Sequence, residues 1–133
     1  MNIVNKKDEA FKNLPYGTKA SLAEVEYQLG FIPNIFTILA NSELSLSAFM
    51  ALNQSFSESS FTAEEKELIQ LVVSLHNECD YCVAGHTAFI AMNALPLEIV
   101  DALKTHQPLA SDKLQNLRLV CEYLLSGKGK AND

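Results

Sequence analysis

Two cysteines and a histidine lie close together in the segment NECDYCVAGHTAF, residues 77–89. Cys79 and Cys82 are three positions apart, and His86 follows four positions after Cys82. On a helix beginning near Asp80, these three side chains would share one face. Two thiols at this spacing can form a disulfide, and a neighbouring imidazole can take up or hold the thiol proton. The segment predicts a redox-active Cys-x-x-Cys pair with an acid–base partner.

The spacing leaves open which of the two cysteines attacks the substrate. The free N–H groups of a helix start stabilise a thiolate, which favours Cys79. Contact with His86 favours Cys82. The attacking thiolate would react with a peroxide or a disulfide, and the second cysteine would resolve the intermediate into an intramolecular disulfide. This chemistry needs an external thiol reductant but no bound organic cofactor.

A carboxylate on the preceding helix could complete the site. Glu67 lies at the edge of the apolar stripe of a helix that leads directly into the cysteine turn. In an antiparallel hairpin it could approach His86, orient the imidazole and raise its basicity. Glu64 and Glu65 are rival candidates for this role.

Three other interpretations of the cysteine pair stay open. The pair could be buried and unreactive. It could bind zinc through the two thiolates and His86, with Glu67 or water as the fourth ligand, although no second Cys-x-x-Cys pair is present. The disulfide could also act as a redox switch that changes partner binding without turnover. The third cysteine, Cys121, lies on an apolar stripe and is predicted to be ordinary core.

Composition narrows the class of protein. The chain has 133 residues, 48% of them hydrophobic and 20% charged, in the range of one globular domain over residues 1–133. A formal charge of −6 disfavours partners such as nucleic acid or anionic membranes, which need a basic patch. No apolar run approaches a membrane span, and the first residues do not read as a signal peptide. We expect a soluble, cytosolic protein.

The elements that must position these residues are helices. No segment shows sustained alternation of apolar and polar residues, so the fold class is predicted to be all-α, with seven or eight helices in antiparallel hairpins. Thr62 and Glu65 form a capping-box pattern, and Gly30 is a typical helix end. The last helix should carry one apolar face that consists of Leu114, Leu117, Val120, Cys121 and Leu124. The predicted helices cover 7–14, 18–30, a segment starting near Pro33, one from Ser42 or Ser45 to about 57, one from Thr62, one from Asp80 to about Asn93, one from Pro96, and one from Ser111 or Asp112.

The four candidate residues also carry a family resemblance. Glu67, eleven intervening residues, Cys79-x-x-Cys82, three residues and His86 form a pattern similar to that of the alkylhydroperoxidase-D-like proteins of the carboxymuconolactone decarboxylase superfamily. The segments GFIPNIF, 30–36, and TAEEKELIQLVVSLHNECDYCVAGH, 62–86, resemble the family as well, with the core motif region at 62–94. The resemblance covers roughly residues 22–125.

This resemblance implies a helical-hairpin fold assembled as a homo-oligomer, trimeric or hexameric. It implies antioxidant peroxidase activity of the peroxiredoxin type, or disulfide reductase activity, with an external thiol reductant or adaptor protein. Cys82 would attack, Cys79 would resolve, and His86 and Glu67 would relay the proton. Tyr81 stands between the cysteines where the best-studied type carries histidine, and tyrosine, with a pKa of about 10, cannot share a proton relay at neutral pH in the same way.

Overall fold

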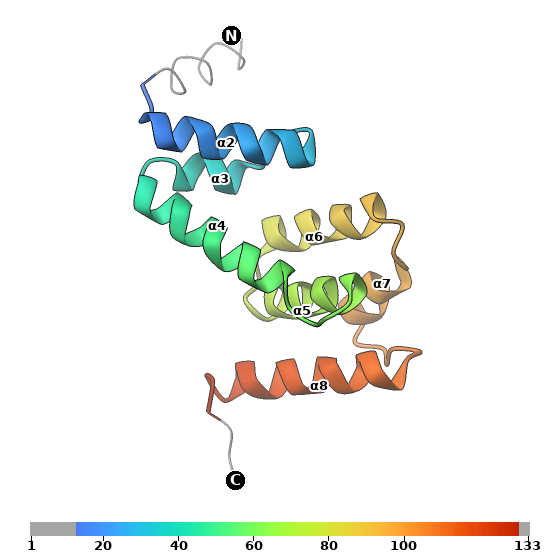
Figure 1. Cartoon of the computed structure of the whole chain (residues 1–133). Helices are drawn as coiled ribbons and strands as arrows, with labels where there is room; N and C mark the ends of the chain where they lie inside the picture. Colours follow the sequence, from blue (N-terminus) through green and yellow to red (C-terminus); the bar gives the residue numbers. More distant parts are fainter. Residues whose placement is uncertain (1–12, 131–133) are drawn as a thin grey trace. The chain divides into compact units, whose positions relative to one another are not determined.

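The computed structural model describes residues 13–130, and all regular structure within them is helical (Figure 1). The predicted all-α class is confirmed. The helix predicted over 7–14 lies outside the described residues except for positions 13 and 14, which are not helical. The seven described helices are α2 (Tyr16–Leu29), α3 (Asn34–Leu39), α4 (Glu43–Ser57), α5 (Ala63–His76), α6 (Asp80–Met92), α7 (Glu98–Lys104) and α8 (Asp112–Ser126).

Residue contacts divide the chain into two compact units that meet in sequence between Ser59 and Ser60. The first unit contains α2, α3 and α4. Its small core consists of Leu22, Ala40 and Leu46, and the rings of Phe36 and Phe49 meet edge to face beside it with centroids 5.5 Å apart. The single domain predicted over residues 1–133 stays a prediction.

The second unit contains α5 to α8 and all four candidate site residues. Helix α5 lies between α6 and α8 (Figure 1), and it supplies three core residues, Leu68, Leu71 and Val72. Leu68 and Leu71 are completely inaccessible to solvent. Burying one leucine side chain is worth about 1.5–3 kcal/mol, so the anchored face of α5 fixes where its other side chains point. The remaining core residues are Ile90, Ile99, Val100, Leu103, Leu109 and Leu114.

Local signals in the sequence explain where the helices of this unit begin. The Thr62 hydroxyl accepts a hydrogen bond from the Glu65 N–H, and the Glu65 carboxylate accepts one from the Thr62 N–H at 2.8 Å, which confirms the capping box. The Ser111 hydroxyl caps α8 in the same way, by accepting from the Leu114 N–H. Helix α7 begins at Glu98, two residues later than predicted from Pro96.

The apolar face predicted for α8 is partly wrong. Leu114 is buried and both Leu117 and Cys121 pack against the core, but Val120 is 54% exposed and Leu124 is 41% exposed. The buried positions continue instead through Arg118 and Leu125, since positions 114, 118, 121 and 125 follow one side of a helix. A charged residue, Arg118, therefore lies on the buried side of α8, at a position that the predicted apolar face did not include.

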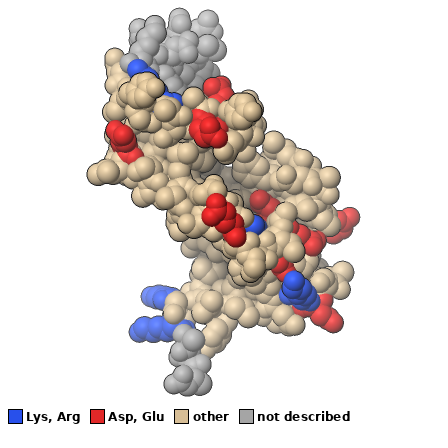
Figure 2. Space-filling view, viewed as in Figure 1, with Lys and Arg blue, Asp and Glu red and all other residues tan. Residues whose placement is uncertain are grey.

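The surface of the described residues carries scattered charges. Figure 2 shows acidic side chains distributed over the face in view, with basic side chains in smaller groups. None of the helices within residues 13–130 combines the length and apolarity that crossing a bilayer requires.

Candidate functional site

The two cysteines lie at the turn that joins α5 to α6. Their sulfur atoms form a disulfide, and their Cα atoms are 5.3 Å apart. Cys79 is the N-cap residue of α6, and its sulfur accepts a hydrogen bond from the Cys82 N–H at 3.2 Å. The predicted proximity of the two thiols is therefore confirmed, and the sulfur of Cys79 occupies the place at which a helix start stabilises negative charge.

The turn itself follows from how α5 ends. Glu78 has a positive φ of 53°, the Glu78 N–H donates to the Leu75 carbonyl, and the Cys79 N–H donates to the Ser74 carbonyl at 3.0 Å. This is the Schellman arrangement, which satisfies the last carbonyls of a helix. The Cys79 carbonyl then accepts from the Val83 N–H in the first turn of α6. Backbone hydrogen bonds thus hold Cys79 to both helices.

The hairpin brings Glu67 of α5 next to His86 of α6. The Nδ1 atom of His86 and the Oε2 atom of Glu67 are 3.0 Å apart, and their side chains are 21% and 14% exposed. An ionised carboxylate only accepts hydrogen bonds, so the Nδ1–H of His86 donates to Glu67, and whenever the ring is neutral its lone pair is on Nε2. A partly buried, charge-assisted bond of this kind fixes both the orientation and the tautomer of the imidazole.

Of the two rival carboxylates, Glu65 has other partners in the structure. Glu65 serves the capping box of α5, and its Oε1 atom lies 2.6 Å from Nζ of Lys113 on α8. The hydrogen bond from Lys113 and that from the Thr62 backbone lower the pKa of the Glu65 carboxyl. This carboxylate is therefore occupied by structural contacts, whereas the bond to His86 belongs to Glu67.

Two neighbours complete the surroundings of the site. The ring of Phe89 lies 6.1 Å from that of His86, centroid to centroid, and is tilted by 54°. Sequence reasoning missed Phe89, although its spacing of three positions from His86 on one helix is the signal that could have found it. Tyr81, between the cysteines, is 51% exposed.

The arrangement can support thiol chemistry. A reduced Cys82 would lie one helical turn before His86 on the same helix, and the imidazole is held by a carboxylate from the facing helix. Within residues 13–130, no group of three or more His, Cys, Asp or Glu side chains is arranged to hold a metal ion. Cys121, the third cysteine, is not disulfide-bonded, and burial together with the nearby Glu122 carboxylate raises the pKa of its thiol.

Comparison with known protein families gives one match. Residues 44–116, more than half of the chain, match the model described as the carboxymuconolactone decarboxylase family. This segment includes all of the hairpin that carries Glu67, the disulfide and His86. No curated protein was found to be similar to the chain. With its helical hairpins and this match, the chain belongs to the carboxymuconolactone decarboxylase family.

Proposed function

We propose that the protein is a thiol oxidoreductase that reduces peroxides or disulfides by cycling Cys79 and Cys82 between dithiol and disulfide. The observation that carries this proposal is the hydrogen bond between Glu67 and His86, 3.0 Å long, on the hairpin that holds the disulfide. An imidazole held by a carboxylate, one helical turn after Cys82 in α6, is an acid–base group of the kind that thiol chemistry requires.

With a peroxide as substrate, the Cys82 thiolate attacks one oxygen and the O–O bond breaks. A sulfenic acid forms on Cys82, and the departing oxygen takes a proton and leaves as an alcohol from an alkyl hydroperoxide or as water from hydrogen peroxide. The thiolate of Cys79 then attacks the sulfur of Cys82, water leaves, and the disulfide forms. An external thiol reductant supplies two electrons and two protons to restore the dithiol.

The neighbours of each sulfur support a division of roles. Cys82 lies four positions before His86, whose Nε2 can accept the thiol proton and return it to the leaving group. Cys79 has the N–H of Cys82 as a hydrogen-bond donor, which favours its thiolate during resolution and when the disulfide is reduced. Because both thiolates have a stabilising neighbour, we assign the attack to Cys82 and the resolution to Cys79 as the resemblance to the alkylhydroperoxidase-D-like proteins implies.

A thiol titration of the reduced protein tests this proposal. The Cys121→Ser variant is the background, because it removes the third thiol from the count. One equivalent of hydrogen peroxide or of a small disulfide should consume two thiols rapidly. Addition of Cys79→Ser should stop the peroxide reaction at a sulfenic acid that a dimedone-type reagent traps, and addition of Cys82→Ser should abolish it.

Each other outcome of the titration points to a different function. Reaction with the disulfide alone would assign the protein to the reductases. Reaction with neither substrate would refute the proposal and leave a structural pair or a zinc site, which metal analysis of the freshly purified protein would distinguish. Formation of the disulfide without turnover, together with a changed oligomeric state, would indicate a redox switch.

A further inference from the structure

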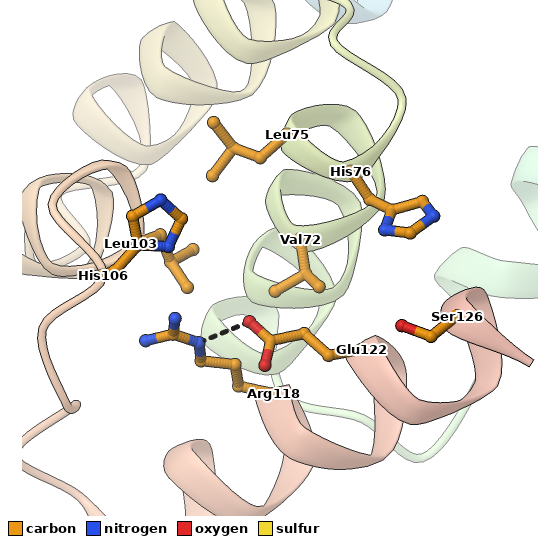
Figure 3. Close-up of a pocket in the computed structure, with 8 residues that line it drawn as sticks. All are labelled: Val72, Leu75, His76, Leu103, His106, Arg118, Glu122 and Ser126. Atoms are coloured by element: carbon orange, nitrogen blue, oxygen red, sulfur yellow. Dashed lines mark hydrogen bonds and ion pairs between the residues drawn. The ribbon is translucent and has the colours of Figure 1, made fainter.

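A groove in the α5–α8 unit is lined by residues other than the cysteine pair. It has a volume of about 410 Å³, and α5, α8 and the end of α7 line it (Figure 3). Neither the two bonded cysteines nor Glu67 and His86 belong to its lining. Its size is within the range of small-molecule sites, about 300–1,000 Å³. A ligand in this groove would be distinct from the substrate of the thiol site.

The groove contains a buried cation with unused donors. The Arg118 side chain is only 9% exposed, and its Nε atom donates to the Glu122 carboxylate at 2.8 Å. One Nη1–H donates to the Gln107 carbonyl at 2.8 Å. A guanidinium has five N–H groups, so three further donors remain. Figure 3 shows the terminal nitrogens pointing away from Glu122, toward the side of the groove on which His106 lies.

The rest of the lining is divided into an apolar wall and a polar rim. Val72 and Leu103 are almost fully buried, and Leu75 is partly buried beside them. The polar rim consists of two imidazoles and a hydroxyl, those of His76, His106 and Ser126 (Figure 3). Because Glu122 already neutralises part of the charge of Arg118, the groove suits a single negative charge better than a dianion.

We propose that this groove binds a small monocarboxylate with a short branched aliphatic tail. The carboxylate would accept hydrogen bonds from the remaining N–H groups of Arg118, which form the planar fork that carboxylates match. The tail would lie mainly against Leu75, the partly exposed residue of the apolar wall, with the buried Val72 and Leu103 behind it. This inference does not depend on the thiol chemistry, since no residue of the cysteine site lines the groove.

Titration of the oxidised full-length protein with isovalerate, followed by ¹⁵N NMR, tests the site. Isovalerate should shift the signals of the Arg118 Nε–H and of the groove-lining amides in a saturable way. Isovaleramide has the same shape without the charge and should cause no comparable shift. Arg118→Lys should weaken binding at least about tenfold, because it loses the planar fork of donors. The matched control is Lys104→Gln, which removes an exposed cation outside the groove and should leave binding unchanged.

Three outcomes would overturn the proposal. They are equal shifts with acid and amide, shifts that do not saturate, and shifts that lie away from the groove. If Arg118→Lys does not fold, the comparison of acid with amide on the unsubstituted protein still decides, because it reports on the Arg118 signal directly.

Discussion

The bond between Glu67 and His86 should set the rate of the proposed thiol reaction. Two substitutions remove this hydrogen bond, one in part and one completely. Glu67→Gln keeps an oxygen that can accept from Nδ1–H but removes the charge, and Glu67→Ala removes the acceptor. If the bond only supported the fold, both variants would change stability and leave the dependence of the rate on pH unaltered.

The size of each effect follows from the geometry. A hydrogen bond to a charged group contributes about 1.5–3 kcal/mol and a neutral one about 0.5–1.5 kcal/mol. The bond here is 3.0 Å long and both partners are largely buried, so solvent screens it weakly. The loss of the charge alone, about 1–1.5 kcal/mol, predicts a rate reduced about 5- to 13-fold in Glu67→Gln. The loss of the whole bond predicts a reduction of up to about 150-fold in Glu67→Ala.

The assay is the rate at which reduced protein in the Cys121→Ser background loses two thiols to peroxide or to a small disulfide, measured from pH 5 to 9. The dependence of the rate on pH should differ between the wild type and Glu67→Gln, since the imidazole loses its carboxylate partner. Glu64→Gln is the matched control, because it removes a neighbouring charge of α5 that is not the partner of His86 in the structure. Wild-type rates and an unchanged profile in Glu67→Ala would refute the proton-relay role.

Three further predictions concern stability and reactivity. Glu78→Val should lower the free energy of unfolding by about 1–2 kcal/mol in urea titrations, because a β-branched residue resists the positive φ of this position. The free energy of unfolding of Glu78→Gly should stay within about 1 kcal/mol of the wild-type value, and equal stability of the two variants would contradict this reasoning. Lys113 lowers the pKa of Glu65, so the ionised carboxylate stabilises the fold fully above its ordinary pKa, about 4.3, and this stabilisation is lost as the pH falls through the lowered pKa. In urea unfolding between pH 7 and 3, Lys113→Met should therefore lose less stability on acidification than the wild type. An identical dependence of the free energy of unfolding on pH would contradict this. Because the pKa of Cys121 is raised, iodoacetamide should alkylate this thiol more slowly than free cysteine at pH 7.5, as measured by mass spectrometry. Alkylation should be faster in Glu122→Gln. A rate equal to that of free cysteine would show that the thiol is unperturbed.

The start of α5 and the cysteine turn could be predicted because their signals are local. A capping box and a Cys-x-x-Cys pair are each complete within four residues, and the structure realises both. The capping box also assigns Glu65 to a structural role. The choice between Glu64 and Glu67 depended instead on the rotation of α5 against α6, which buried contacts between distant residues determine.

Two other features, the ends of three helices and the burial of Arg118, lack a local signal in the sequence. Helices α5, α6 and α7 are each followed by a residue with positive φ that is not glycine, namely Glu78, Ala94 and His106. None of these ends carries the usual glycine signal, although the end predicted at about Asn93 lies within one residue of the observed end of α6 at Met92. The burial of Arg118 was not predicted, since its guanidinium donates to the carbonyl of Gln107, eleven residues earlier in the chain, and no local pattern reports that contact.

The two sets of backbone bonds at Cys79 have a consequence for turnover. Its N–H is bound to the end of α5 and its carbonyl to the start of α6, and neither bond involves sulfur. Breaking the disulfide therefore leaves the main chain of the turn in place, and only side-chain torsions need to change. The reorganisation that accompanies each redox step should be small, so both sulfurs stay positioned for the next reaction. In the redox cycle proposed above, the hairpin would therefore stay closed during both oxidation and reduction.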